Sequence, residues 1–274
     1  MARAIWKGSI SFGLVSIPIK LYTATQPRQI TFHNVHLACG TKLESKRWCP
    51  KCQKEVPWQE VGKGYKIAKD KWVILKKEEL EALQPTSLKT IEILQFVDIS
   101  QIDPIFYEKA YYVVPDELGT KAYSLFVEAL RLTNKAAIGK VVMRNKEYLV
   151  ALRPYKNGLV MHILYYLNEI KDIEELTELK NLVVVSKEEL ELARALIAKL
   201  TKESFDASTF EDSYTKKLIE LIKAKAEGKE VKVEEKVVEK AKSLLEALKA
   251  SIEKVEEGKK EEEKKKEAVK AEAR

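Results

Sequence analysis

Cysteine, histidine and methionine are scarce in this chain: each occurs three times in 274 residues. Three cysteines would leave one thiol unpaired in any disulfide framework, which argues against the small secreted domains that depend on such frameworks. No segment reaches the roughly 20 consecutive apolar residues that span a membrane, and the first residues lack the apolar stretch of a signal peptide. These absences predict a cytoplasmic protein without a membrane partner.

Positive charge exceeds negative charge in this chain, and the excess is unevenly distributed. Apolar residues make up 45% of the chain, enough for one large core or two modest ones. The net charge is +7; residues 1–76 hold 14 Lys and Arg against 4 Asp and Glu, residues 77–222 hold 19 against 24, and residues 223–274 hold 16 against 14. Lysines are often simply solvated surface residues. A surplus of positive charge concentrated in one short region nevertheless favours contact with phosphate groups.

All three cysteines lie in this basic region with one histidine, spaced H-x2-C-x9-C-x2-C. The four are His36, Cys39, Cys49 and Cys52. Each x2 pair can turn tightly enough to aim two side chains at one metal, and four nitrogen and sulfur ligands suit a closed, structural Zn²⁺ site. His33 could replace His36 as the histidine ligand, and a knuckle of buried thiols without metal is the plainer alternative.

A catalytic zinc site is the sharper alternative for the same four residues. Zinc deaminases carry H-x-E followed by P-C-x-x-C, with the glutamate moving protons. Here Leu37 and Ala38 follow His36, so the glutamate is missing, and Pro50 lies inside the second pair. A structural site is therefore favoured. His162, in an apolar run, is interpreted as a core or surface-strand imidazole.

Short apolar and aromatic runs predict strands along most of the first 167 residues. The predicted strands are 4–22, 71–75, 91–97, 107–114, 137–144, 147–153 and 159–167. Helices are predicted at 77–83, 122–132, 186–200 and 211–225, with Ser186 and Glu189 forming a capping box. Many short strands and few long helices predict a closed or nearly closed antiparallel sheet.

The character of the chain changes near Ser186. Residues 1–185 form the β-rich region, with the cysteine knuckle at 33–55 inside it, and residues 186–228 form a helical extension. Residues 229–274 are a Lys/Glu-rich tail, with a solvated or partner-dependent helix expected at 234–255 and disorder at 256–274.

Residues 6–18, WKGSISFGLVSIP, closely resemble the opening signature of the prokaryotic Ku proteins of DNA end joining. The resemblance continues through both cysteine pairs and through motifs spread over the β-rich and helical regions. These motifs lie at 64–65, 91–93, 111–115, 137–144, 151–154, 205–206 and 212–214. It spans roughly residues 4–228. The tail departs from the pattern, because many relatives make it strongly basic and here it is nearly balanced.

The resemblance implies a fold and a function. The fold is α+β, mainly β: a Ku-type antiparallel β-barrel with an arch, joined here to the structural zinc knuckle and a C-terminal helical extension. Two copies would form a homodimeric ring threaded by a double-stranded DNA end, bound with little regard to sequence. The resemblance also implies that the protein has no enzyme activity and that it recruits an ATP-dependent DNA ligase. It would place the protein in the cytoplasm, in association with the nucleoid. The extension is interpreted as packing on the core or across the dimer, or as docking the ligase.

Ten basic residues are candidates for phosphate contact. Five surround the cysteines, where a zinc knuckle would hold them rigidly: Lys42, Lys46, Arg47, Lys51 and Lys54. Five lie on or between adjacent strands of a hairpin that the family match turns toward DNA: Lys140, Arg144, Lys146, Arg153 and Lys156. Arg144 and Arg153 are preferred because guanidinium groups match phosphate oxygens. For any single lysine, an ordinary solvated side chain is the competing interpretation.

Two other classes of function compete with the end-binding protein. A zinc-dependent nucleic-acid-modifying enzyme is disfavoured by the missing glutamate and the few histidines. A zinc-ribbon adaptor that binds other proteins remains the second alternative.

Overall fold

The computed structural model describes residues 3–28, 30–69, 71–82, 89–144, 146–228 and 247–253. The chain forms two compact units, residues 1–172 and 173–274. The sequence pattern places the division at residue 186, where a helix begins. In the structure, residues 173–185 belong to the second unit, and they contain the short 3₁₀ turns Ile173–Glu175 and Thr177–Asn181.

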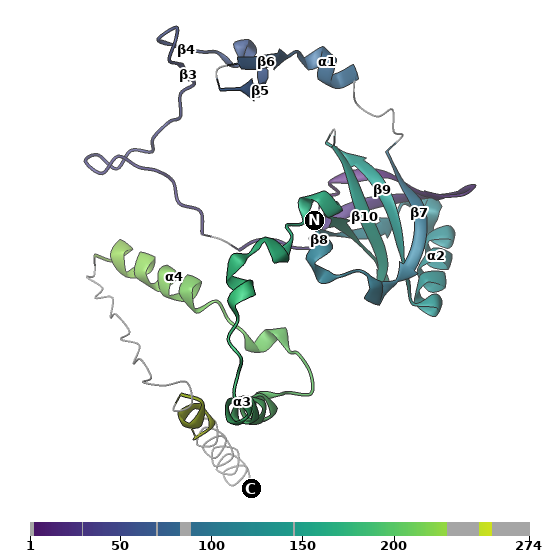
Figure 1. Cartoon of the computed structure of the whole chain (residues 1–274). Helices are drawn as coiled ribbons and strands as arrows, with labels where there is room; N and C mark the ends of the chain where they lie inside the picture. Colours follow the sequence, from purple (N-terminus) through teal and green to yellow (C-terminus); the bar gives the residue numbers. More distant parts are fainter. Residues whose placement is uncertain are drawn as a thin grey trace. The chain divides into compact units, whose positions relative to one another are not determined.

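Seven strands of the first unit close into a barrel (Figure 1). They are β1 (Trp6–Phe12), β2 (Val15–Thr23), β7 (Thr90–Asp98), β8 (Tyr107–Pro115), β9 (Lys135–Met143), β10 (Lys146–Tyr155) and β11 (Gly158–Leu164). Their order around the barrel is β1-β2-β8-β11-β10-β9-β7. The predicted closed sheet is confirmed, but a wholly antiparallel one is wrong: β1 and β7, which close the barrel, run parallel.

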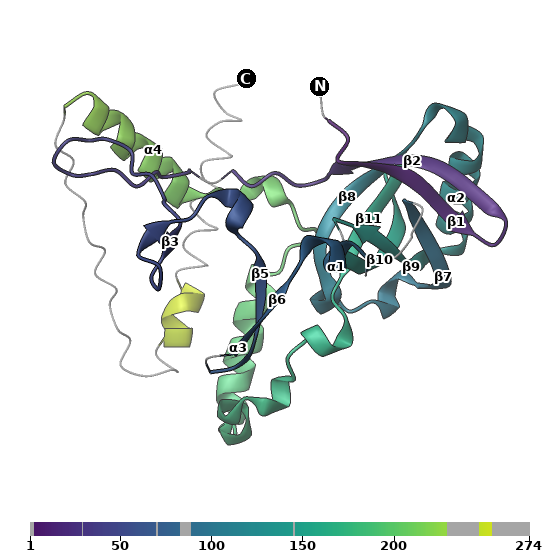
Figure 2. The ribbon, with the colours of Figure 1, turned by 90° about the horizontal axis from the view of Figure 1, so that it is seen from above.

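Alternate residues of each strand fill the barrel, as the two-residue period of a strand requires. On β10 and β11 the core residues are Val150, Leu152, Leu159, Met161 and Ile163. Helix α2 (Thr120–Thr133) lies beside the barrel (Figure 2), packs against β9, β10 and β11, and adds its own apolar face to this core. Hydrogen bonding between neighbouring strands and the burial of apolar side chains in one core therefore both stabilise the barrel together with α2.

A buried tyrosine joins α2 to the sheet. The Tyr123 hydroxyl donates to the Val113 carbonyl at 2.5 Å and accepts from the Leu159 N–H at 2.8 Å, so one side chain contacts both β8 and β11. Burial raises the pKa of Tyr123, which stays a neutral donor at physiological pH. This side chain thus supplies a hydrogen-bond partner to one backbone group on each of the two strands.

Two glycines are required by the backbone of the barrel. Gly13 has φ +56° in the tight turn between β1 and β2, a conformation that favours glycine. Gly139 on β9 faces β7, and a Cβ atom there would lie 2.3 Å from the Glu92 carbonyl oxygen. The close approach of β7 and β9 therefore depends on the absence of a side chain at residue 139.

The chain between β2 and β7, residues 24–89, is an insertion into the barrel and is called here the inserted segment. It contains β3 (Trp48–Cys49), β4 (Lys54–Glu55), β5 (Lys63–Ala68), β6 (Lys71–Leu75) and α1 (Lys77–Ala82). The strands form two separate hairpins, β3–β4 and β5–β6. None of its described side chains is buried. Strand β6 and α1 match the predicted positions, whereas β3, β4 and β5 are not predicted.

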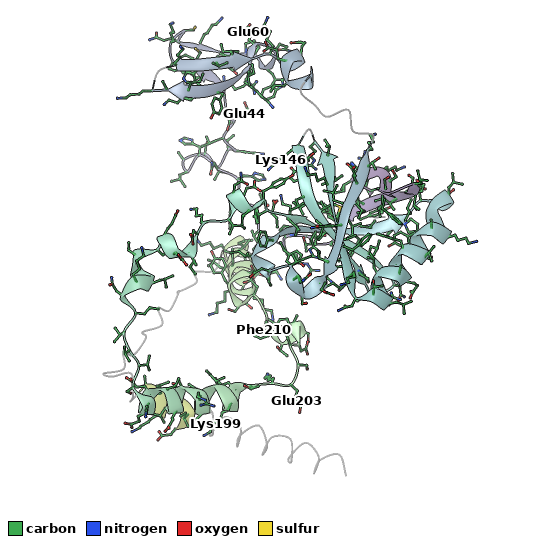
Figure 3. The ribbon with its side chains drawn as sticks, turned by 45° about the vertical axis from the view of Figure 1, so that its right-hand side comes forward. Glu44, Glu60, Lys146, Lys199, Glu203 and Phe210 are labelled. Atoms are coloured by element: carbon green, nitrogen blue, oxygen red, sulfur yellow. The ribbon has the colours of Figure 1, made fainter. Side chains whose placement is uncertain are left out.

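The second unit is helical in its described part. Helix α3 (Lys187–Leu200) begins with the predicted capping box, in which the Ser186 side chain accepts from the Glu189 N–H. Helix α4 (Ser213–Ala226) begins after Asp212, whose side chain accepts from the Thr215 N–H. Neither helix has a buried residue, and Phe210 between them is exposed (Figure 3).

The tail is described only in part. Residues 247–253 are helical and lie within the helix expected at 234–255. The other residues of that expected helix, and the tail from residue 254 onward, lie outside the described ranges. Among the helices that the structure describes, none is both long enough and apolar enough to cross a membrane.

Candidate nucleic-acid interface

The ten predicted phosphate contacts lie in two places that the fold keeps distinct. Five belong to the knuckle region (residues 33–55) of the inserted segment, and five to the hairpins formed by β9, β10 and β11. The first group sits beside the predicted metal ligands. The second sits on the barrel.

The predicted metal ligands form two close pairs. His36 Nδ1 lies 3.1 Å from Cys39 Sγ, across a turn in which the Gly40 N–H donates to the His36 carbonyl at 2.7 Å. Hydrogen bonding with the Thr41 side chain, then with the Thr41 backbone and with His36, lowers the pKa of Cys39. A lowered pKa favours the thiolate, which is the form that binds metals.

The second pair occupies the β3–β4 hairpin. Cys49 ends β3 and Cys52 lies in the turn. Hydrogen bonds from the Cys52 backbone and then from the Cys52 side chain lower the pKa of Cys49, and the same contact raises the pKa of Cys52. One thiolate and one thiol donor is the arrangement expected of two adjacent cysteines that share a proton.

The two pairs are not brought together. In the described ranges, no group of three or more His, Cys, Asp and Glu side chains is placed to hold a metal ion. Each pair fits half of a tetrahedral site in donor type, and the four-ligand zinc site stays a prediction. The alternative ligand His33 is exposed, as are Cys39 and Cys52.

The cations of the knuckle region differ in how they are held. Lys46 forms an ion pair with Glu55 at 3.4 Å. Arg47 Nε donates to the Val56 carbonyl at 3.3 Å, and its guanidinium lies 5.1 Å from the centre of the Trp58 ring. The other three, Lys42, Lys51 and Lys54, are exposed and form no ion pair with a described residue. Arg47 is thus oriented by neutral groups, so its charge remains available to an anion.

The five hairpin cations do not converge, because they lie near the two ends of β10. This strand has 10 residues, roughly 33 Å at about 3.3 Å per residue. At its first end, Lys140 pairs with Glu147 at 2.9 Å and Lys146 lies 3.6 Å from Glu169. Hydrogen bonding to Glu147 raises the pKa of Lys140, and the same contact lowers the pKa of Glu147. Arg144 is exposed in the turn, with φ +50°.

The second end of β10 combines cations with aromatic rings. Arg153 and Lys156 both lie over the Tyr155 ring, at 5.8 and 5.7 Å from its centre. The rings of Tyr155 and Tyr112 stack with their centres 6.1 Å apart. Arg131 of α2 donates to the Lys156 carbonyl at 2.6 Å, which fixes this turn to the helix. The result is a cationic edge with flat apolar surfaces, suited to a sugar-phosphate backbone.

His162 on β11 orients one of these cations. Arg153 Nε donates to His162 Nε2 at 3.2 Å, and the imidazole packs 4.7 Å from the centre of the Tyr107 ring. Burial, and then the charge of Arg153, lowers the pKa of His162 to about 4. The imidazole is therefore neutral at physiological pH and acts as an acceptor. The prediction of a surface-strand imidazole agrees with this position.

Sequence reasoning missed the carboxylates that neutralise part of the predicted site. Glu147 and Glu169 bind Lys140 and Lys146, and Glu55 binds Lys46. The first pair carries a detectable signal, because the β9–β10 register pairs Leu149 with Lys140 and Glu147 with Val142, which makes residues 140 and 147 diagonal neighbours. Glu169 lies in a 3₁₀ turn, Leu167–Glu169, which begins where the predicted strand 159–167 ends, and it carries no such signal.

Comparison with known proteins gives one family over most of the chain. A family model described as the Ku70/Ku80 beta-barrel domain matches residues 11–192. The Non-homologous end joining protein Ku of Archaeoglobus fulgidus is 46% identical over 253 residues, which cover 92% of this chain and 99% of that protein. The protein of the same name from Heliobacterium modesticaldum is 42% identical over 270 residues, covering 97% and 98%. That from Bacillus subtilis is 37% identical over 260 residues, covering 92% and 82%.

Proposed function

The chain belongs to the Ku family, and from this we propose that it binds the ends of double-stranded DNA without regard to sequence, in double-strand break repair by non-homologous end joining. The names of its relatives supply the pathway. The predicted contacts are arginines and lysines on strands and turns, which suit phosphates and carry no code for bases.

The observation that carries the proposal is the topology of the inserted segment. It leaves the barrel at the end of β2 and returns to it at the start of β7, and both strands neighbour β1 in the barrel. A chain of this length, anchored at both ends and without a buried side chain in its described part, is able to pass around a ligand. Paired with the same segment of a second copy, it would complete a ring that loads only where a duplex stops.

The homodimer has separate support in the second unit. Its helices carry apolar side chains that no described residue of the same chain buries, among them Leu190, Ile197, Ile219 and Ile222. Exposed apolar faces of this extent mark interaction surfaces in water-soluble domains. We assign them to contact with a second copy of the chain, with the docking of an ATP-dependent DNA ligase as the other role of residues 186–228. The protein itself would perform no chemistry, and the ligase would seal the break.

Zinc is proposed as a structural element of the knuckle region. His36 with Cys39, and Cys49 with Cys52, would each supply half of a tetrahedral site; the bound ion would lock the basic loop between them. The test is the zinc content of the purified full-length protein, before and after the change of Cys49 and Cys52 to serine. About one equivalent per chain, lost in the variant, supports the site; less than about half an equivalent in the native protein contradicts it.

The end-binding mechanism is tested by competition. Full-length protein bound to a labelled linear duplex is challenged with unlabelled closed circular duplex, or with the same circle cut once. We expect the cut circle to compete far better than the closed one, because a closed ring needs a free end to load. Equal competition by the two would exclude the threaded ring. Cutting the circle at several different sites is the control for sequence, and it should leave competition unchanged.

A further inference from the structure

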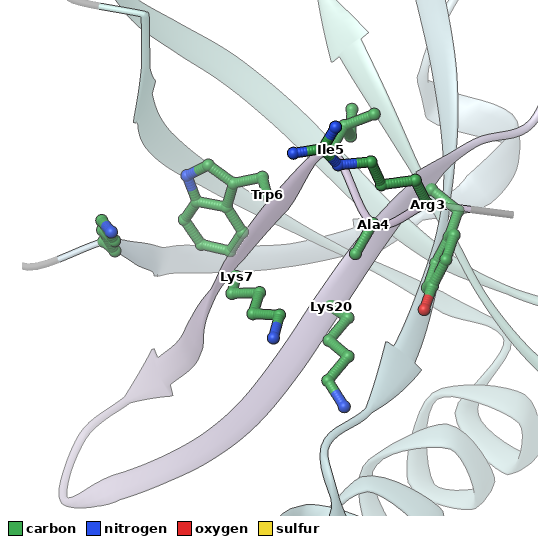
Figure 4. A pocket seen from close by; sticks show the side chains of 8 residues that line it. Arg3, Ala4, Ile5, Trp6, Lys7 and Lys20 are labelled. Carbon is green, nitrogen blue, oxygen red and sulfur yellow. The ribbon is translucent and has the colours of Figure 1, made fainter.

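A basic pocket lies at the start of the barrel, apart from the ten predicted contacts. It has a volume of about 660 Å³ and is lined by Arg3, Ala4, Ile5, Trp6, Lys7, Lys20, Tyr22 and Lys89 (Figure 4). Four of these eight residues are cations, and none is an acid. An aromatic ring from each of β1 and β2 completes the lining.

The strand register forces two of the cations together. Lys7 of β1 and Lys20 of β2 are direct cross-strand partners, and both side chains extend to the same side of the hairpin (Figure 4). Like charges directly opposite each other in an antiparallel pair destabilise the sheet. A sheet that keeps such a pair has a use for concentrated positive charge at this point.

Gly8 allows the Lys89 backbone and the Trp6 ring to approach β1 closely. A Cβ atom at Gly8 would lie 1.9 Å from the Lys89 carbonyl oxygen and 2.3 Å from the Trp6 ring. The Ser9 N–H donates to the same Lys89 carbonyl at 3.0 Å. Residue 89 is thereby fixed against β1, and the Trp6 indole lies over Gly8. Two of the four cations therefore stand on paired barrel strands, and the backbone of a third is fixed to β1.

Among the described residues, one ion pair offsets part of this charge. Asp116 forms an ion pair with Lys20 at 2.8 Å. Within the described part of the chain, Arg3, Lys7 and Lys89 form no ion pair. This contrasts with the hairpin cations Lys140 and Lys146, each of which has a glutamate partner. Three cations without an ion-pair partner in the described ranges, around a concave and partly aromatic surface, are the recognition chemistry for a phosphorylated sugar chain.

We propose that this pocket binds phosphate groups of the DNA backbone, with Lys7 and Lys89 as the principal contacts, Arg3 completing the site and Trp6 packing against a sugar. The inference rests on the proposed DNA binding and adds a contact surface formed by residue 3, β1, β2 and residue 89. Lys20 is held by Asp116 and serves chiefly to position the hairpin. A free phosphate compound would satisfy the same cations, so the test separates the two sources.

The test compares two doubly substituted full-length proteins of equal net charge. The pocket variant carries Lys7→Gln and Lys89→Gln; the control carries Lys121→Gln and Lys171→Gln, two exposed lysines outside the pocket. Affinity for a linear duplex is measured over a range of salt concentrations. Each lost phosphate contact lowers the slope of log K against log salt by about 0.9, so the pocket variant should lose roughly 1.8 and bind roughly sixtyfold more weakly at about 0.1 M salt. The control should change less than about twofold.

A second readout locates the ligand. Acetylation of surface lysines is followed by mass spectrometry in the free protein, with linear duplex, and with inorganic phosphate. Protection of Lys7 and Lys89 by duplex alone supports the proposal. Protection by inorganic phosphate alone, or a pocket variant whose salt slope equals that of the control, overturns it. The variant Lys7→Arg with Lys89→Arg should restore both slope and affinity, which a merely structural role of these lysines would not predict.

The two proposals fail separately. If linear and closed circular duplex compete equally, the threaded ring is excluded, but the salt slope of the pocket variant still reports whether β1 and β2 contact phosphates. If the ring is upheld and the slope is unchanged, only the pocket is removed from the interface.

Discussion

The barrel and the inserted segment contain similar kinds of residues but use them differently. Leu152 of β10 is 0% exposed, whereas Ile74 of β6 is 74% exposed, although both are aliphatic residues on strands. Every buried apolar residue of the described chain lies in the barrel strands or α2. The difference is one of pairing: each barrel strand has a neighbour on both sides, and β5 and β6 have only each other. Apolar composition alone therefore does not make a core.

The largest expected effect separates these two regions directly. Leu152→Ala should lower the free energy of unfolding of the barrel by about 2–5 kcal/mol, because it removes a fully buried side chain and leaves a cavity. Ile74→Ala, the matched change on an exposed strand, should cost less than about 0.5 kcal/mol. Hydrogen exchange resolved by segment provides the measurement: only Leu152→Ala should accelerate exchange in β10 and β11. A large effect of Ile74→Ala would show that β6 is packed in solution.

A smaller effect tests how α2 is joined to the barrel. Tyr123→Phe removes the hydroxyl that serves both Val113 and Leu159 and should lower the free energy of unfolding by about 1–3 kcal/mol, because two buried backbone groups lose their partner. Urea denaturation followed by circular dichroism gives the value. Tyr65→Phe in β5 is the control, since Tyr65 is exposed. Equal stability of the Tyr123 variant and the native protein would mean that water replaces the hydroxyl.

The smallest effect concerns pH. The pKa of His162 is lowered from 6.5 to about 4 in the folded chain. The unfolded state therefore binds the proton first as pH falls, so stability is complete above about 6.5 and is lost between 6.5 and 4. Because the imidazole is only half-buried, solvent screening reduces the loss to on the order of 1 kcal/mol. His162→Gln should flatten this part of the curve of unfolding free energy against pH; an unchanged curve would assign the dependence to other groups.

Much of the barrel is predictable because its signals are local. The runs at 91–97, 107–114 and 147–153 fall within β7, β8 and β10, and the capping box at Ser186 marks the start of α3. The parallel pairing of β1 with β7 is not predictable from these signals, since it joins Ser9 to Thr90 across the whole inserted segment. Strands β3, β4 and β5 are also missed, because short exposed hairpins lack the alternation of apolar and polar residues.

The candidate site is less predictable than the fold. The spacing of His36, Cys39, Cys49 and Cys52 identifies two pairs, and the structure agrees within each pair but does not unite them. The prediction of the ten basic residues rests on their type and neighbourhood, which say nothing of Glu147 or Glu169. The pocket around Lys7 and Lys89 was missed because its members come from residues 3–5, β1, β2 and the residue before β7.

The order of strands in the barrel also has a consequence for synthesis on the ribosome. The hairpin of β1 and β2 emerges first, but the strands that complete its two edges, β7 and β8, begin only at Thr90 and Tyr107. At about 5–20 residues per second, the interval is on the order of several seconds. During that time a lone hairpin is barely stable and leaves both edges open. The nascent chain thus has a period of exposure to aggregation and to chaperones that is fixed by the length of the inserted segment.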